Sequence, residues 1–199
     1  SMEEEERWDM INFLRALSYA EQARQMSTLV EPDPWLVAPD FIYRTNGTEG
    51  RSIKDHRGNS VVLLVLFDLP DSQSRLAALD QAYGELKNKG VEVLAVPKEV
   101  EEIQRLSPDI KSLPLVTDGS RETFDSYALF RRTFSERGTL PDPPIPSHME
   151  FLIDRQGYVR ARWIPQDGPG WEKIDNLFRQ IDRLNKETPS MPAPDEHVH

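Results

Sequence analysis

The residues best placed to do chemistry stand where a long apolar run ends. Residues 61–67 read Val-Val-Leu-Leu-Val-Leu-Phe, and Ser72 follows them at the start of a helical pattern. The positive end of a helix dipole stabilises a thiolate at such a junction, yet the chain contains no cysteine. Thiol chemistry is therefore excluded throughout the chain.

Ser72 is the remaining candidate nucleophile at this junction. A serine hydroxyl attacks only when an adjacent base takes its proton, and no histidine stands close to Ser72 in the sequence. A serine ahead of a helix is a favourable N-cap, a role worth ~1 kcal/mol. The sequence therefore predicts a capping role for Ser72 and no catalytic residue in the chain.

Histidine and methionine are the residues that could hold a metal. Copper(I) prefers imidazole and thioether ligands, and His148 and Met149 offer one of each side by side. Neighbours in a strand point to opposite faces, so the two would share an ion only if His148 lies in an irregular loop. His56 could join them only through folding, whereas His197 and His199 would bind copper(II) or nickel adventitiously near the chain end. An exposed loop histidine without a ligand role is the other interpretation of His148.

Composition limits the partners of the chain. The net charge of −10 argues against nucleic acid and anionic lipid, because both reward lysine and arginine. The longest apolar run has seven residues, far short of the ~20 that a membrane helix needs, so we do not expect this sequence to span a bilayer by itself. We expect no signal peptide, and Ser1-Met2 resembles a cloning remnant on an excised piece of a longer protein.

Hydrophobic periodicity divides the chain into four parts. Residues 3–26 carry apolar side chains at helical spacing and form a predicted amphipathic helix, which packs on the domain or on a neighbour outside this sequence. Prolines mark residues 27–35 as an extended connector. Residues 36–185 are the predicted globular domain, and the proline-rich residues 186–199 are predicted to be a disordered tail.

Within the domain, strands alternate with helices. The predicted strands are 41–43, 51–54, 61–67, 91–96, 113–117, 150–154 and 158–163, and the predicted helices are 72–88, 97–106, 121–130 and 171–185. Asn-Gly at 46–47 and Arg-Gln-Gly at 155–157 indicate hairpins. This order predicts an α/β fold in which a mixed sheet has helices on both faces.

Four short motifs, in this order, resemble the thioredoxin-like superfamily in its peroxiredoxin and TlpA-like branch. They are Ala38-Pro39-Asp40-Phe41, the strand 61–67 with Ser72, Leu113-Pro114-Leu115-Val116-Thr117-Asp118 with Tyr127-Ala128-Leu129, and Phe151-Leu152-Ile153-Asp154-Arg155-Gln156-Gly157. The resemblance covers residues 36–185 and implies a thioredoxin-like mixed sheet flanked by helices.

The resemblance also marks three positions where this chain departs from the family. Ser72 and Arg75 stand where the family has its nucleophilic and resolving cysteines, and a one-residue gap would select Asp71 and Ser74 instead. His148 stands where the family usually has a cis-proline beside those cysteines. Ser72, Arg75 and His148 are thus predicted to be vestigial positions of a dismantled redox site that needs no cofactor.

A narrower resemblance concerns the surroundings of the protein. Residues 8–17 look like the last helix of a class I cytochrome c, without a haem-attachment motif. Residues 61–67, 95–97 and 148–163 are similar to the soluble C-terminal extension of bacterial copper-resistance D membrane proteins. This implies a place on the periplasmic face of a bacterial membrane, with a membrane protein or the membrane-anchored remainder of the same chain as partner. A second copy of the chain, in a homodimer, is a further candidate partner.

Two functions follow from these patterns. The first is a redox-inactive, non-enzymatic interaction module of a periplasmic, membrane-associated copper-handling or respiratory system. The alternative is a copper-binding carrier that uses His148 and Met149. The alternative requires both side chains to reach one ion, so it depends on whether His148 lies in a loop or in a strand.

Overall fold

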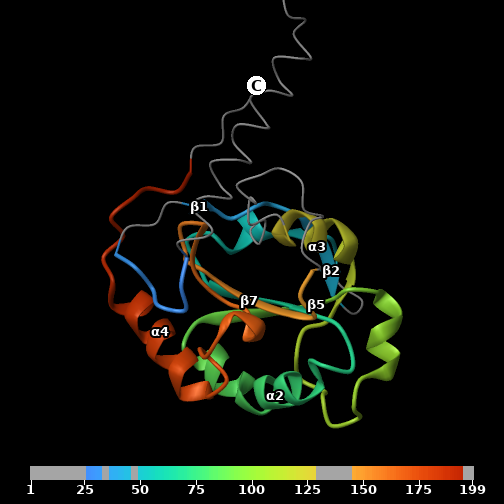
Figure 1. Ribbon diagram of the computed structural model, residues 1–199. Coiled ribbons are helices and arrows are strands. Elements are labelled where there is room, and N and C mark those ends of the chain that lie inside the picture. Colours follow the sequence, from blue (N-terminus) through green and yellow to red (C-terminus); the bar gives the residue numbers. More distant parts are fainter. Residues whose placement is uncertain (1–25, 33–35, 46–48, 129–144, 195–199) are drawn as a thin grey trace, which may run out of the picture.

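The computed structural model describes residues 26–32, 36–45, 49–128 and 145–194 (Figure 1). The predicted N-terminal helix up to residue 25, the Asn46-Gly47 turn, and His197 and His199 lie outside these residues. Within them, no helix combines the length and apolar character needed to cross a membrane.

The domain is built on a five-stranded mixed sheet with the strand order β1-β8-β7-β4-β5. These strands span Leu36–Val37 (β1), Val61–Phe67 (β4), Val91–Pro97 (β5), His148–Ile153 (β7) and Tyr158–Trp163 (β8). β4 runs parallel to β5 and antiparallel to β7, so both strand directions meet at the centre. A smaller sheet of order β3-β2-β6 comprises Ile42–Thr45 (β2), Arg51–Ser52 (β3) and Val116–Asp118 (β6).

Helices cover both faces of the five-stranded sheet (Figure 1). α2 (Gln73–Asn88) and α4 (Ile174–Lys186) pack on one face, and α3 (Ser120–Ala128) packs with the small sheet on the other. Three short 3-10 helices lie between these elements: η1 (Ile53–His56), η2 (Val100–Arg105) and η4 (Pro165–Asp167). The predicted α/β fold, a mixed sheet with helices on both faces, is confirmed.

Strand β4 separates two apolar clusters because its side chains alternate. Leu63 and Val65 belong to the cluster beneath α2 and α4, whereas Leu64 and Leu66 belong to the cluster beneath α3. All residues of β4 are buried, as expected of a central strand covered on both faces. The uninterrupted apolar run in the sequence therefore reflects a strand that packs against two layers.

Several boundaries differ from the predictions. β7 begins at His148 rather than at residue 150, and residues 53–54 of the strand predicted over 51–54 belong to η1. Leu36–Val37 forms β1 by pairing with β8, although the sequence predicts no strand there. The helix predicted over 97–106 is shortened to η2. The strand predicted over 113–117 begins only at Val116, and Leu115 makes an isolated bridge to Ala95. The boundaries of β1 and β6 depend on strand pairing between distant segments, which a local sequence pattern does not reveal.

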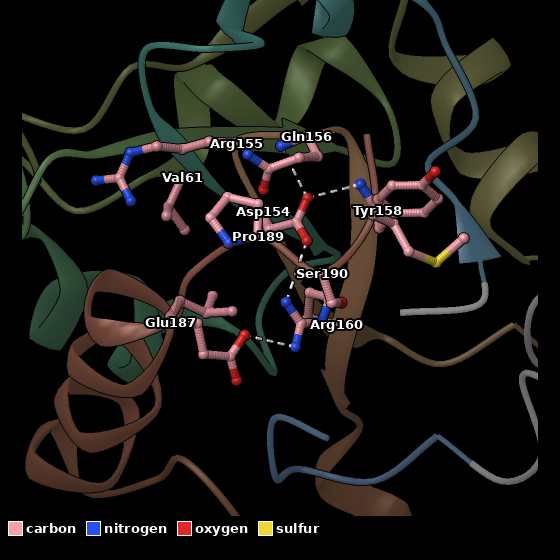
Figure 2. A pocket seen from close by; sticks show the side chains of 11 residues that line it. Val61, Asp154, Arg155, Gln156, Tyr158, Arg160, Glu187, Pro189 and Ser190 are labelled. Atoms are coloured by element: carbon pink, nitrogen blue, oxygen red, sulfur yellow. Dashed lines mark hydrogen bonds and ion pairs between the residues drawn. The ribbon is translucent and has the colours of Figure 1, made fainter. Parts of the chain in front are cut away.

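The segment after α4 lies against β8 as far as Pro192, although its composition predicts disorder from residue 186 (Figure 2). The Arg160 guanidinium donates to Glu187 at 2.7 Å and to Asp154 at 3.1 Å. The Tyr158 hydroxyl donates to the Pro192 carbonyl oxygen at 3.0 Å. Long-range polar contacts thus hold a segment that has few apolar side chains of its own.

Candidate functional site

Ser72 lies in the turn between β4 and α2, but it does not cap the helix as predicted. Its backbone is already in the helical region, at φ −85 and ψ −5, and its side chain makes no capping hydrogen bond. The hydroxyl instead donates to the Ser147 carbonyl oxygen at 3.0 Å. Only 1% of Ser72 is exposed, so the hydroxyl is enclosed between the start of α2 and the start of β7.

His148 lies beside Ser72 in space. It is the first residue of β7 and pairs with Phe67, the last residue of β4, which brings its ring to the end of the strand that leads to Ser72. Its Nδ1 atom lies 3.0 Å from the Ser72 Oγ, across 76 positions of sequence. His148 is buried. The expectation of an exposed loop histidine is therefore wrong, and folding supplies Ser72 with the histidine neighbour that it lacks in the sequence.

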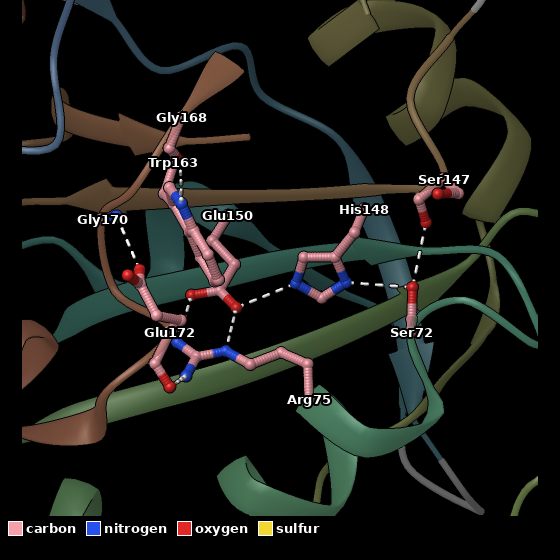
Figure 3. A network of polar contacts seen from close by, with 9 residues as sticks. All are labelled: Ser72, Arg75, Ser147, His148, Glu150, Trp163, Gly168, Gly170 and Glu172. Atoms are coloured by element: carbon pink, nitrogen blue, oxygen red, sulfur yellow. Dashed lines mark hydrogen bonds and ion pairs between the residues drawn. The ribbon is translucent and has the colours of Figure 1, made fainter. Parts of the chain in front are cut away.

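Glu150 completes the group, and sequence reasoning missed it. It stands two residues after His148 on the same face of β7, and its Oε1 lies 2.9 Å from His148 Nε2. Arg75 of α2 donates two hydrogen bonds to the same carboxylate, from Nε to Oε1 at 2.6 Å and from Nη2 to Oε2 at 2.8 Å (Figure 3). The sequence did contain a signal for this ion pair. Glu150 is a charged residue in a predicted buried strand, and the predicted helix after Ser72 carries an arginine.

The electrostatics of Glu150 follow from these partners. Burial alone would raise the pKa of this fully enclosed carboxyl, but the charge and hydrogen bonds of Arg75, aided by His148, outweigh burial and lower the pKa to about 2. Arg75 is stabilised further because its guanidinium lies 4.9 Å from the centre of the Trp163 ring. Glu150 is thus an ionised carboxylate whose negative charge is balanced mainly by the Arg75 guanidinium.

The directions of the hydrogen bonds decide what this group can do. Ionised Glu150 only accepts, so His148 Nε2 donates to it. Ser72 gives its own proton to the Ser147 carbonyl oxygen, so that proton is directed at the backbone and not at the His148 ring, although Nδ1 lies 3.0 Å from the Ser72 oxygen. The serine, histidine and glutamate resemble a hydrolytic triad in composition but not in proton direction.

The positions predicted to be vestigial are therefore brought together. Arg75 and His148 contact Glu150, and Ser72, in the turn before α2, contacts His148 (Figure 3). We call these four residues the Glu150 network. The alternative register would have selected Asp71 and Ser74, whose side chains are exposed. The ungapped register thus corresponds to the positions that point into the domain.

The condition set for a shared copper site, an irregular loop at His148, is not met. Both residues lie in strand β7, so His148 faces α2 while Met149 is fully buried in the cluster beneath α3. His56 is committed elsewhere, since its Nε2 lies 2.7 Å from the Tyr43 hydroxyl, and burial lowers its pKa. Among the residues that the structure describes, no group of three or more histidine and acidic side chains is arranged to hold a metal ion.

Comparisons with known proteins agree with this fold. The sequence profile of the AhpC/TSA family matches residues 36–162. No curated protein matches the chain. Among solved structures, the chain is similar to a putative thiol:disulfide interchange protein DsbE from Chlorobium tepidum, at 22% sequence identity. The match covers 77% of this chain and 99% of that chain, with a TM-score of 0.55.

Two further structures show the same likeness. The mitochondrial 2-Cys peroxiredoxin from Plasmodium falciparum is 17% identical, with 75% of this chain and 92% of that chain covered and a TM-score of 0.56. A thiol:disulfide interchange protein from Bacteroides sp. is 16% identical, with 86% and 99% covered and a TM-score of 0.54. At these identities the comparisons establish a thioredoxin-like fold, and the predicted fold class is confirmed.

Proposed function

The chain belongs to the AhpC/TSA family, and we propose that it is a redox-inactive member, a thioredoxin-like interaction module that works without catalysis at the periplasmic face of a bacterial membrane. Its partner would be a membrane protein of a copper-handling or respiratory system, or a membrane-anchored remainder of the same chain. The observation that carries the proposal is the Glu150 network, which fills the place of a thiol centre with buried, mutually compensated groups.

A thiol enzyme needs a sulfur atom that a substrate can reach, and this chain offers neither the atom nor the access. It has no cysteine, and Ser72, His148 and Glu150 are all buried. Ser72 is a poor replacement for the sulfur, because it is buried and its proton is donated to a backbone carbonyl oxygen. The fold is kept while the chemistry is gone, which favours a role in binding.

The membrane setting rests on the sequence resemblance of residues 61–67, 95–97 and 148–163 to the soluble extension of copper-resistance D proteins. One of these segments contains β7, which carries His148 and Glu150, and another is β4, which pairs with β7. The net charge of −10 is compatible with a protein partner and unfavourable for direct attachment to anionic lipid.

A pair of activity assays tests the redox part of the proposal. Reduction of insulin disulfides with dithiothreitol, and hydroperoxide consumption, should proceed at the rate of the buffer alone, whereas an active thioredoxin and an active peroxiredoxin accelerate them. Labelling with a fluorophosphonate probe should leave Ser72 unmodified. Turnover that rises with the concentration of this chain, or a stable adduct at Ser72, would overturn the proposal.

The membrane setting is tested in cells that carry the gene. After fractionation we expect the protein with the washed membranes, and after removal of the outer barrier we expect added protease to degrade it while cytosolic markers survive. Recovery in the cytosolic fraction, protected from protease, would contradict the periplasmic assignment without affecting the redox part of the proposal.

A further inference from the structure

A second buried carboxyl group, Glu102 of η2, lies against the residue that follows β4. The side chains of Glu102 and Asp68 are hydrogen-bonded to each other, and Lys98 Nζ lies 3.0 Å from Asp68 Oδ2. Two ionised carboxylates have no proton to share, so this hydrogen bond requires one of the two groups to be protonated. Since the lysine contacts Asp68, Asp68 is the ionised member and Glu102 holds the proton.

Because Glu102 is buried, loss of its proton would be energetically costly. Only 3% of Glu102 is exposed, and its Oε2 atom is enclosed with no hydrogen-bond donor among the described residues. Without the proton, a buried carboxylate would face a second carboxylate, an arrangement that strongly disfavours the charged form. Arg105, on the same helix, lies 3.6 Å from Glu102 Oε1 but is 62% exposed, so solvent weakens its compensation.

The other elements beside η2 add little positive charge. β5 leads into Lys98, which is already paired with Asp68, and Glu99 then precedes η2. β6, which also contacts η2, ends at Asp118, and Asp118 pairs with Arg44 at 3.8 Å. Arg121 of α3 lines the groove beside residues 98–100 but is exposed, so solvent weakens its charge. The environment of Glu102 therefore favours its protonated form.

The start of η2 also borders an open groove of about 470 Å³. Lys98, Glu99 and Val100 line one side of this groove, and Ile42 with residues 117–122 lines the rest. Ile42 is 67% exposed and Val100 is 39% exposed, so the groove presents apolar surface to solvent. Movement of η2 away from the end of β4 would change the shape of the groove.

We propose that the Asp68–Glu102 pair is a proton-operated latch, in which the shared proton holds η2 on the end of β4 and loss of that proton releases η2 and reshapes the groove. Burial, followed by the hydrogen bond and the charge of Asp68, raises the pKa of Glu102 to about 7. The latch therefore opens within the physiological pH range. Its action does not depend on which partner the domain binds, nor on the absence of redox activity.

Hydrogen exchange measured by mass spectrometry on the whole chain tests the latch. Two reporter amides lie in the relevant peptide: Glu102 N–H, which donates to the Glu99 carbonyl oxygen, and Leu106 N–H, which donates to the Ile103 carbonyl oxygen. After correction for intrinsic exchange, protection of residues 99–106 should fall by roughly tenfold between pH 5.5 and 8. Protection of residues 61–67 should stay constant.

Three variants make the test decisive. Glu102→Gln carries a permanent donor and should make protection of residues 99–106 independent of pH, whereas Glu101→Gln, at the exposed neighbouring position, should behave like wild type. Asp68→Asn removes the opposing charge and should move the transition to lower pH, so it reports on the pair even if Glu102→Gln folds poorly. A flat wild-type profile, or the wild-type pH dependence retained in Glu102→Gln or Asp68→Asn, would overturn the latch.

Discussion

Glu150 and Glu102 are both buried glutamates, and their neighbours shift their pKa values in opposite directions. Burial penalises ionisation of each. For Glu150 the Arg75 guanidinium outweighs burial, and the pKa falls to about 2, whereas for Glu102 the Asp68 carboxyl adds to the effect of burial, and the pKa rises to about 7. The first group stays charged under ordinary conditions, while the second changes its charge near neutrality.

The difference separates a permanent contact from a titratable one within the same fold. Glu150 joins α2 to β7 through the interior of the domain. Glu102 belongs to η2, whose first residue, Val100, lines an open groove. The Glu150 contact is thus a fixed structural link, whereas the proposed latch lies beside the groove.

The largest effect is expected when the Glu150 network loses its cation. Arg75→Leu would leave Glu150 buried without a guanidinium, and breaking a buried ion pair on one side costs about 3–5 kcal/mol. We expect a loss of this size in the free energy of unfolding, measured by urea denaturation. Arg121→Leu, at an exposed position, is the matched control and should change stability by less than ~0.5 kcal/mol.

A double variant decides whether the pair itself is stabilising. Arg75→Leu combined with Glu150→Leu removes both charges, and apolar replacement of a buried pair is often close to neutral. Recovery of most of the stability in the double variant is expected. If Arg75→Leu alone proves as stable as wild type, Glu150 is not held as an ionised carboxylate and its contrast with Glu102 disappears.

The pH dependence of stability should show the two glutamates acting in opposite directions. The pKa of Glu150 is lowered to about 2, so its contribution is present above the unfolded value and is lost as pH falls from about 4.5 to about 2. The pKa of Glu102 is raised to about 7, so its contribution is present at low pH and is lost as pH rises from about 4.5 to about 7. Each change is on the order of 1–3 kcal/mol.

Denaturant titrations between pH 2.5 and 8 resolve the two contributions. Glu102→Gln should abolish the loss of unfolding free energy between pH 4.5 and 7 and keep the loss below pH 4.5. Glu150→Gln should abolish the loss below pH 4.5 and keep the loss towards pH 7, at a lower overall stability. A wild-type profile that is unaffected by Glu102→Gln between pH 5 and 7 would show that Glu102 titrates normally in the folded protein.

A smaller effect is expected for the contact between Ser72 and His148. The two side chains are 3.0 Å apart and buried, and a hydrogen bond in such a setting contributes ~1 kcal/mol beyond its separate parts. A double-mutant cycle with Ser72→Ala, His148→Ala and the combined variant should give a coupling free energy near that value. Coupling near zero would mean that the two groups do not interact in solution.

The fold could be predicted because its signals are local, whereas the site required long-range pairing. The apolar run 61–67 and the helical pattern after it occur where β4 and α2 are found. The spacing from Phe67 selected Ser72 and Arg75 as counterparts of the family's cysteines, and the structure places both in the Glu150 network. The sequence does not reveal the strand register that pairs Phe67 with His148. These residues are about 80 positions apart, and no motif in β4 or β7 indicates which residues of the two strands lie opposite each other.

The smallest effect is expected for the binding of copper(I). A copper(I) titration tests whether His148 stays bonded within the Glu150 network or can leave it to bind a metal ion. Both ring nitrogens of His148 are engaged, one by Ser72 and one by Glu150, and Met149 lies on the opposite face of β7. An anaerobic titration against a competing chelator should therefore give the same binding curve for the full chain and for His148→Ala, with any weak binding removed by His197→Ala and His199→Ala. Tight one-to-one binding that is lost in His148→Ala would require the ring to leave Glu150, and the network would then be a mobile ligand set.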